Sequence, residues 1–426
     1  MTTDIAVPEE LRDVVKGTID GLHGFVDKEV LPLEQEFKEI LSDERKLFGE
    51  DGLLVEPVRR ARDSVRRKSA QAGFWAMFSP SQIGGGGLSA VAVPFILEAL
   101  YRRYGPGRLF ITWAKGFLTS PILASFVDGP SGLFLNAGEA VKREVLPHLL
   151  AGEKTVCFAL SEPDAGSDLY NLKCRARRDG DEWVISGTKQ WITNAPYADY
   201  AAIFAVSNPE MLAQHKGGIT CLLVDAHSPG YHPERPLPIM GHLFSDCGAI
   251  NLDEVRVRAD YMLGVEDQGF QVGMFGISEG RLGIAAGCVG MAEWALDRAL
   301  EYSQQRRTFG VPIAEHQAIQ FMLADSAIEI VAAKQTVVQT ARLIEAMPST
   351  GRLPVKEISI AKAYAVEMSQ RVLDRAIQIH GGMGLSSELA LEEGFRIART
   401  LRIPDGTSEI QRRTIARQLL RGDTVF

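Results

Sequence analysis

A single carboxylate, Asp405, stands on a short turn between Pro404 and Gly406, directly before the segment 408–420. That segment alternates charged and apolar residues at helical spacing, so we expect a helix there. Proline cannot continue a helix, glycine relaxes the backbone, and either of the two hydroxyl residues that follow can cap the new helix. An isolated Asp-Gly-Thr sequence most often serves only as a helix cap. Any chemistry at Asp405 therefore depends on what the rest of the chain supplies.

Two stretches near the middle of the chain place hydroxyl, amide and aromatic groups on predicted strands or at their ends. The loop SEPDAGSD contains Ser161 and Ser167 and, taken alone, is most simply a turn. The run GTKQWITNA places Trp191 beside Thr193. A tryptophan on a strand usually belongs to a core, yet these neighbours also suit a planar, heteroatom-rich ligand.

A third stretch, QRRTFGVPIAEHQAIQ, sets polar and aromatic side chains around a bend between two predicted helices. They are Arg306, Phe309, His316 and Gln317. His316 alone would more often be a core or capping histidine, so the stretch gains meaning only in combination with the others.

Length, charge and cysteine usage limit the function classes. A chain of 426 residues predicts two or three domains and a core large enough to enclose a cofactor. The net charge of -8 argues against a nucleic-acid partner, although local arginines could hold a phosphorylated small molecule. Five scattered cysteines without a CxxC pair indicate reduced thiols and no zinc site. The N-terminus lacks an apolar segment and no stretch is long enough to span a bilayer, so we expect a cytoplasmic protein without a membrane partner.

The elements that must position these groups change in character twice along the chain. Residues 1–154 follow a mostly helical period, and the basic run in 58–72 is expected to form a solvated helix face. Residues 155–264 contain short β-branched or alternating runs separated by turns, which predicts a compact antiparallel β domain. Residues 265–426 return to the helical period, which predicts an antiparallel helical bundle. The fold class is therefore α+β. The predicted strands are 155–161, 182–193, 200–207, 219–225 and 249–257, and the predicted bundle helices are 268–305, 314–347, 354–380, 387–401 and 408–420.

The order of these motifs resembles the acyl-CoA dehydrogenase family of flavoproteins. The stretches ALSEPDAGSD, GTKQWITNA, QRRTFGVPIAEHQAIQFMLAD and QIHGGMGLSSE are each close to family signatures. The resemblance covers nearly the whole chain and is weakest in 29–62. It implies an N-terminal helical domain, a middle β domain and a C-terminal four-helix bundle.

The resemblance implies that FAD is bound, with its ring against the β-domain motifs and its pyrophosphate and adenylate at the helical bend. An arginine is expected at a pyrophosphate because its planar fork pairs with phosphate oxygens. Part of the site, 378–382, would be completed from a neighbouring subunit of a homotetramer or homodimer. The implied cofactor-binding residues are Phe158, Leu160, Ser161, Ser167, Trp191, Thr193, Arg306, Thr308, Phe309, His316, Gln317, Gln378, Gly382, Thr407 and Glu409.

The implied reaction is the α,β-dehydrogenation of an acyl-CoA thioester to the trans-2-enoyl-CoA, within fatty acid metabolism. Asp405 matches the base that removes the α proton while the β hydride moves to the flavin, and its own N–H would help to stabilise the thioester oxygen. Burial is expected to raise the pKa of Asp405 towards neutrality. An electron-transfer flavoprotein is the implied electron acceptor. The implied substrate contacts are Ser167, Ser278, Arg281 and Gly406.

The chain departs from the usual family pattern at the base itself. Most members carry glutamate where this chain has Asp405, although a minority branch and the related nitroalkane oxidases also use aspartate. The shorter side chain moves the carboxylate by roughly 1 to 1.5 Å. A second family solution places the glutamate at the position of Gly280, and here its neighbour Glu279 should point away because one residue turns a helix by about 100°. The absent side chain at Gly280 favours a bulky, branched or long acyl group.

Two other functions remain open from the sequence. A flavin oxidase of the acyl-CoA or nitroalkane type would use the same fold and reduce oxygen directly. A non-catalytic flavin-binding or CoA-binding scaffold would use Asp405 only as a cap. Rapid reoxidation of the reduced flavin by air would indicate the oxidase. A flavin absorption band that no acyl-CoA bleaches would indicate the non-catalytic scaffold.

Overall fold

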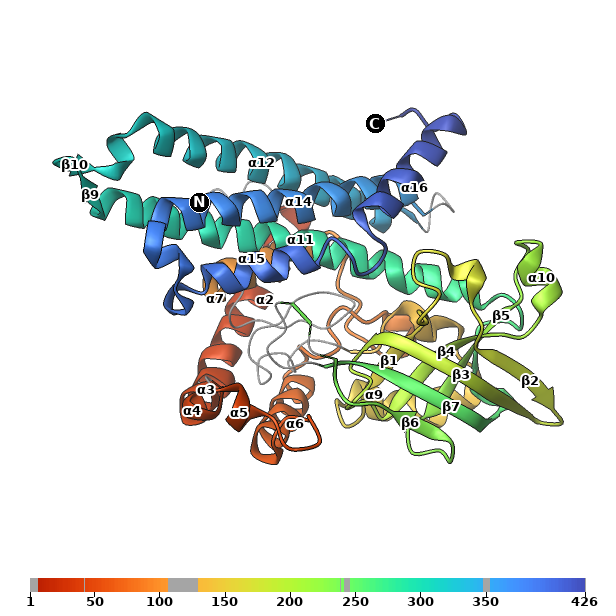
Figure 1. Cartoon of the computed structure of the whole chain (residues 1–426). Coiled ribbons are helices and arrows are strands. Elements are labelled where there is room, and N and C mark those ends of the chain that lie inside the picture. The colour runs from red at the N-terminus through yellow and green to blue at the C-terminus, as the bar shows by residue number, and fades with distance from the viewer. Residues whose placement is uncertain are drawn as a thin grey trace. The chain divides into compact units, whose positions relative to one another are not determined.

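A computed structural model describes residues 7–41, 43–105, 129–237, 239–240, 246–347 and 353–425 of the chain (Figure 1). By its internal contacts the chain divides into two compact units. The first comprises Met1–Lys28, Ser89–Ala124 and Ser278–Phe426, and the second comprises Glu29–Leu88 and Ser125–Ile277. The three predicted domains, 1–154, 155–264 and 265–426, stay a prediction.

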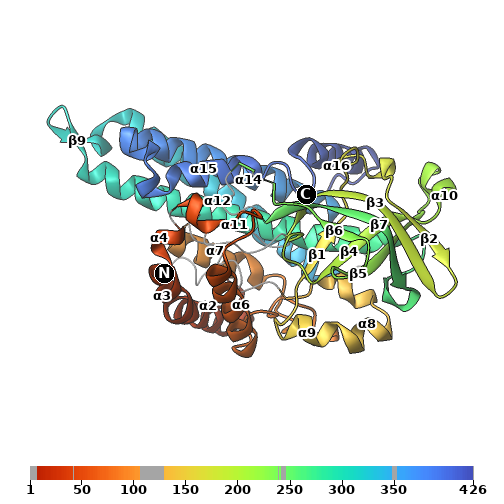
Figure 2. The same ribbon diagram turned by 60° about the horizontal axis from the view of Figure 1, so that its bottom comes forward.

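The first unit is helical, and its long helices lie alongside one another (Figures 1 and 2). The predicted helix at the chain end agrees with α16 in both bounds, and the other bundle helices are shorter than predicted by a few residues at one or both ends. The long helix α11 begins in the second unit and continues through the first. The helices are α2 (Arg12–Phe25), α7 (Ala92–Tyr104), α11 (Gly269–Gln305), α12 (Gln317–Glu345), α14 (Val355–His380), α15 (Leu391–Thr400) and α16 (Ser408–Leu420), with a small hairpin of β9 (Arg307–Thr308) and β10 (Val311–Pro312).

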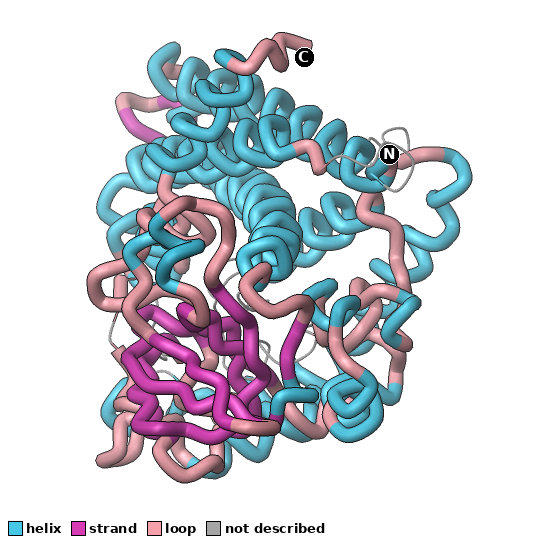
Figure 3. The backbone as a smooth tube through the Cα atoms, turned by 90° about the vertical axis from the view of Figure 1, so that its right-hand side faces the viewer, coloured by secondary structure: helices cyan, strands magenta, loops and turns pink. Residues whose placement is uncertain are grey.

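The second unit contains a sheet that has eight strands within the described residues, in the order β6-β7-β3-β2-β4-β5-β8, with β1 beside β4 (Figure 3). Pairing is antiparallel except where β4 runs parallel to β1 and to β2. The strands are β1 (Val156–Ala159), β2 (Arg175–Asp179), β3 (Glu182–Thr193), β4 (Tyr200–Val206), β5 (Ile219–Asp225), β6 (Tyr231–Pro233), β7 (Cys247–Arg258) and β8 (Met262–Leu263). Its helices are short apart from α6: α3 (Leu31–Glu36), α4 (Lys38–Leu41), α5 (Glu44–Leu47), α6 (Glu56–Gln71), α8 (Glu139–Glu144), α9 (Leu146–Leu150) and α10 (Pro209–Ala213).

The central strand β4 explains why this sheet is stable. Successive side chains of a strand point to opposite faces, and in β4 both sets are buried. Ala202 and Phe204 join one apolar cluster together with residues of α8 and α9. Ala201 and Ile203 join a second cluster together with Trp183 and other strand residues. The sheet is therefore a two-sided core that holds the loops at its strand ends firmly.

Helix α6 corrects one expectation. Its basic face is not wholly solvated, because Arg62 is 8% exposed and Arg66 is 7% exposed. Arg62 donates to Asn194 Oδ1 at 3.3 Å, and Arg66 donates to the carbonyl of Gly152 at 2.6 Å. These two arginines tie the helix to loops of its own unit.

Two features exclude simple ligand sites. The glycine run 84–87 is packed against its own loop, because the N–H groups of all four glycines donate to carbonyls of residues 76–81 and are not free to bind a phosphate group. All five cysteines are free and buried.

Within the described residues, no helix combines the length and apolarity needed to cross a membrane.

Candidate active site

The turn that carries Asp405 is formed by two consecutive residues in the left-handed region, Asp405 at φ 54° and Gly406 at φ 93°. Glycine adopts this region freely, and aspartate is among the few other residues that tolerate it. Thr407 is the N-cap of α16, and its hydroxyl accepts a hydrogen bond from the Ile410 N–H at 3.2 Å. Because Thr407 already caps the helix, the capping interpretation of Asp405 is not needed.

Three buried side chains donate hydrogen bonds to the carbonyls of residues 404–406. Lys362 Nζ, from α14, donates to the carbonyls of Pro404 and Gly406 at 2.7 Å each. Arg281 Nε, from α11, donates to the Asp405 carbonyl at 2.8 Å. Gln411 Nε2, from α16, donates to the Asp405 carbonyl at 3.1 Å and to the Gly406 carbonyl at 2.9 Å. The turn is thereby fixed by three separate helices of one unit.

The Asp405 carboxyl group itself is placed differently from its backbone. Its Oδ2 is fully buried and has no hydrogen-bond partner among the described residues. Burial raises the pKa of Asp405 from 3.8 to about 6, while the charges of Lys362 and Arg281 oppose that rise. A carboxylate with a pKa near neutrality and a free oxygen is suited to accept a proton.

Gly406 cannot be exchanged for a larger residue without disturbing this arrangement. A Cβ at that position would lie 2.9 Å from Gln411 Nε2 and 3.1 Å from Arg281 Nη2. The positive φ adds a second reason for glycine. Among the other predicted substrate contacts, Ser278 is 4% exposed and Arg281 is 6% exposed, both on α11.

In the second unit, the predicted motifs after β1 and at the end of β3 lie together. Ser161 Oγ donates to the Gln190 carbonyl at 2.7 Å, and the Gln190 N–H donates back to the Ser161 carbonyl at 3.0 Å. The register of β3 shifts between Lys189 and Ile192. Within this bulge Trp191 has φ 62° and is 54% exposed. The exposure excludes the core interpretation of Trp191 and leaves its ring available to a ligand.

A buried ion pair holds the same two segments together. Lys189 Nζ lies 2.7 Å from Glu162 Oε1 and donates to the Leu160 carbonyl at 3.0 Å. The side chains of Lys189 and Glu162 are 0% and 4% exposed. Glu162 also accepts from the N–H groups of Lys173 and Cys174 at 2.6 and 3.0 Å. The loop that carries Ser161 is consequently rigid.

The other predicted residues of this unit differ in exposure. Phe158 packs against Phe204 with ring centroids 4.7 Å apart, and Leu160 is buried. Thr193 is half-buried opposite Cys247, whereas Ser167 is exposed on its loop.

The predicted phosphate and adenylate residues gather at one end of the helices, around β9, β10 and the end of α14 (Figure 1). Phe309 is 96% exposed at φ 51°. His316 Nε2 lies 3.0 Å from Thr308 Oγ1, and Tyr302 stacks on His380 at 4.4 Å. The remaining exposed members are Arg306, Gln317, Gln378 and Gly382.

This group and the Asp405 turn lie at opposite ends of the long helices, since α16 is at the other end from β9 (Figure 1). From Arg281 to Tyr302 along α11 the helical rise amounts to roughly 30 Å. Glu409 is exposed and is the second residue of α16, so it belongs to the same end of the helices as Asp405. The structure therefore brings the predicted residues of this unit together as two separate groups.

Sequence reasoning missed Lys362 and Gln411. Lys362 did leave a signal, because Ile358 and Val366, one turn to either side of it on α14, are both buried apolar residues. A lysine on a buried helix face needs a partner, and the turn carbonyls supply it. No such pattern marks Gln411.

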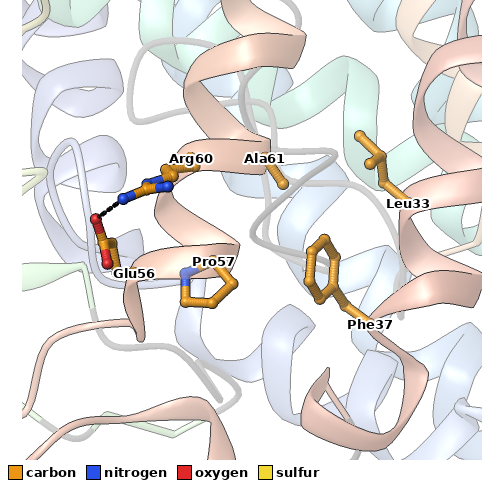
Figure 4. A pocket seen from close by; sticks show the side chains of 6 residues that line it. All are labelled: Leu33, Phe37, Glu56, Pro57, Arg60 and Ala61. Carbon is orange, nitrogen blue, oxygen red and sulfur yellow. Dashed lines mark hydrogen bonds and ion pairs between the residues drawn. The ribbon is translucent and has the colours of Figure 1, made fainter.

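One cavity lies apart from all predicted residues. It measures about 340 Å³, and Figure 4 shows Phe37 facing Pro57 across it. Within the described residues no cluster of His, Cys, Asp or Glu is placed to hold a metal ion. The cavity is lined by Leu33, Phe37, Glu56, Pro57, Arg60 and Ala61.

Comparison with known proteins identifies the family. The family models for the acyl-CoA dehydrogenase middle domain and C-terminal domain match residues 157–255 and 267–420. The chain belongs to the acyl-CoA dehydrogenase family. It is 35% identical over 359 residues to the human mitochondrial short-chain specific acyl-CoA dehydrogenase, covering 83% of this chain and 82% of that one.

Other acyl-CoA dehydrogenase relatives agree. The chain is 34% identical over 380 residues to the caffeyl-CoA reductase-Etf complex subunit CarC of Acetobacterium woodii, covering 88% and 96% of the two chains. The crystal structure of acyl-CoA dehydrogenase from Geobacillus kaustophilus superposes with a TM-score of 0.79 at 28% identity, covering 96% and 99%. The predicted fold of helical N-terminus, middle sheet domain and C-terminal helices is confirmed. The protein is an oxidoreductase of the acyl-CoA dehydrogenase family.

Proposed function

We propose that this protein oxidises an acyl-CoA thioester to the trans-2-enoyl-CoA, with Asp405 as the base. The observation that carries the proposal is the state of the Asp405 carboxyl group. It is held on a left-handed turn, its Oδ2 is buried without a partner among the described residues, and the helix behind it is capped by Thr407. An acid that has a buried carboxylate oxygen without a partner, and that does not cap its own helix, is a candidate for proton transfer.

Asp405 accepts the α proton of the thioester at Oδ2. With a pKa of about 6, the Asp405 carboxylate is ionised above that pH. It is also a stronger base than an ordinary carboxylate, which suits it to accept a proton at neutral pH. Within the described residues, no acceptor takes the N–H of Asp405, so that group is available to the thioester oxygen. Arg281 and Lys362 act on Asp405 as positive charges, and positive charge here favours the negative charge that develops on the substrate. Burial lowers the pKa of Lys362 to about 8, so its ammonium group is charged below that pH.

Each unit, taken by itself, carries residues that suit a part of FAD. Trp191 presents an exposed ring at the end of β3, two residues before Thr193 and next to Gln190, whose carbonyl accepts a hydrogen bond from Ser161 Oγ. Arg306 and the almost fully exposed Phe309 suit a phosphate and a planar base. FAD, when bound, supplies the acceptor for the hydride of the β carbon.

We further propose that two copies of the chain complete each cofactor site. The phosphate-side residues and Asp405 are separated by most of the length of α11, too far for one chain to serve one flavin from both ends. Helix α12 also exposes Phe321, Ile328 and Val331 at spacings typical of a helix that packs against another helix. A homotetramer or homodimer fits these features, and the cytoplasm is its proposed location.

We also propose an electron-transfer flavoprotein as acceptor. The Acetobacterium woodii relative is named as a subunit of a complex with Etf, which supports such a partner here. The absent side chain at Gly280 favours a bulky, branched or long acyl group, and fatty acid metabolism is the proposed context.

The deciding experiment is an anaerobic titration of the FAD-loaded protein with short, long, branched and cyclic acyl-CoAs. Bleaching of the flavin band by one of these supports the proposal, and its loss in the Asp405→Asn variant, with FAD still bound, supports the role of the base. Full reduction in that variant refutes the assignment of Asp405. Rapid reoxidation by air would instead indicate an oxidase, and the absence of bleaching with every acyl-CoA would indicate a non-catalytic scaffold.

A further inference from the structure

Lys362 is a buried cation that contacts both sides of the Asp405 turn. Its side chain is 0% exposed in the middle of α14. The ammonium group donates to the carbonyls of Pro404 and Gly406 at 2.7 Å each, the residues immediately before and after Asp405. Arg281 donates to the Asp405 carbonyl, and Gln411 donates to the carbonyls of Asp405 and Gly406. Among the described residues, only Lys362 donates to the Pro404 carbonyl.

The partners of Lys362 distinguish it from the other fully buried lysines. Lys189 pairs with Glu162 at 2.7 Å, and Lys356 pairs with Asp423 at 2.9 Å. Within the described residues, no carboxylate lies within ion-pair distance of Lys362 Nζ. Burying an ammonium group without a carboxylate is costly, and an apolar side chain of similar size would pack there at less cost. Stability alone therefore does not explain a lysine at this position.

The backbone geometry gives a reason. Glycine is unstrained in the left-handed region, but for Asp405 this conformation is less favoured than an ordinary one, so it persists where its surroundings fix it. The peptide group between residues 404 and 405 determines the direction in which the Asp405 side chain leaves the backbone. Lys362 Nζ fixes that peptide group through the Pro404 carbonyl, and through the Gly406 carbonyl it also fixes the peptide group between residues 406 and 407. An error of about 1 Å in the position of a catalytic group costs roughly a hundredfold in rate.

We propose that Lys362 is a positioning residue that sets the direction of the Asp405 carboxylate, an inference that rests on the proposed function of Asp405. The charge of Lys362 adds a second effect. It is the largest of the nearby charges that oppose the rise in the pKa of Asp405, ahead of Arg281. The ionisable groups that act on Lys362 are Asp405, Arg281, Cys288 and Glu409.

The test compares two substitutions on the same helix, Lys362→Met and Lys356→Met. Both remove a buried ammonium group from α14, but Lys356 contacts the chain end at Asp423 and Val425 and not the Asp405 turn. Flavin binding, circular dichroism and the unfolding midpoint are measured first. The rate of flavin reduction by the acyl-CoA that reduces the wild type is then followed from pH 5 to 9 by stopped flow.

The Lys362→Met variant is expected to bind FAD, to lose at least about tenfold in reduction rate, and to show a pH midpoint above that of the wild type. Lys356→Met is expected to keep both the rate and the midpoint, even if its unfolding midpoint falls. An unchanged rate and midpoint in Lys362→Met, or equal changes in both variants, overturns the proposal. If Lys362→Met does not fold, Lys362→Gln replaces it, and an unchanged pH midpoint in that variant overturns the proposal in the same way.

A second readout does not depend on activity. The infrared carboxyl band of Asp405, identified by its absence in Asp405→Asn, is titrated in wild type and Lys362→Met. An upward shift of its midpoint supports the role of Lys362 even if no acyl-CoA reduces the flavin, in which case only the proposed function fails. An unmoved midpoint together with normal reduction refutes the role of Lys362 and leaves the proposed function intact.

Discussion

Asp405→Asn should make the protein more stable at alkaline pH while abolishing its activity. In the folded chain burial raises the pKa of Asp405 from 3.8 to about 6. At about 1.4 kcal/mol per pH unit, this rise corresponds to about 3 kcal/mol of folding free energy that is lost when the carboxyl group ionises. Asparagine has nearly the same shape and carries no charge.

The sign of the pH dependence follows from the direction of the change in pKa. Because the folded pKa is above the unfolded one, Asp405 favours folding below pH about 4 and loses that contribution as the pH rises through about 6. The variant should therefore exceed the wild type by up to about 3 kcal/mol at pH 8, by less near pH 5, and by nothing below pH about 4.

The assay is urea unfolding of both proteins at pH 4, 5, 6 and 8 with the same concentration of FAD. Flavin reduction by acyl-CoA is measured on the same samples. Equal stability of the two proteins at pH 8 would refute the claim that the Asp405 carboxylate is costly to bury. So would a gain that stays constant down to pH 4.

Three further substitutions test the surrounding structure. Gly406→Ala should lower the rate of flavin reduction by roughly a hundredfold with FAD bound, because its Cβ would lie 2.9 Å from Gln411 Nε2; a wild-type rate would contradict this. Lys189→Met should lower the free energy of unfolding in urea by about 3–5 kcal/mol, because it leaves the buried Glu162 carboxylate without its cation; a loss below 1 kcal/mol would show that the pair does not hold this loop. Phe309→Ala should leave the unfolding of the cofactor-free protein unchanged, because the ring is 96% exposed, yet weaken FAD binding in fluorescence titrations by about tenfold; equal affinity would remove Phe309 from the cofactor site.

Much of the fold could be predicted from the sequence where local pattern and tertiary structure agree. Strands β3 and β5 and helix α16 have the bounds that alternation and helical period indicate. Strand β2 was missed because only Ala176 of its five residues is buried, so the charged run Arg175–Asp179 shows no apolar alternation. It is a strand because β3 and β4 supply its hydrogen-bond partners, and such partners are not visible in a local window.

In the candidate site, too, the local features could be predicted from the sequence and the contacts with distant residues could not. Pro404 and Gly406 predict a turn, and the resemblance to the family points to Asp405. The left-handed φ of Asp405 and the donors that hold it could not be predicted, because Arg281 and Lys362 come from helices far away in the chain. The buried Arg62 likewise looked like part of a solvated basic face until its contact with Asn194 was known.

The burial of every cysteine has a practical consequence. Burial raises the pKa of the thiols of Cys157, Cys247 and Cys288 to about 12 and that of Cys174 to about 11, and it raises that of Cys221 further still. Thiolate is the form that maleimides and iodoacetamides attack, so the folded protein should remain unmodified by these reagents. A single cysteine introduced on the surface would then take up a fluorophore or spin label selectively, without prior removal of the native five.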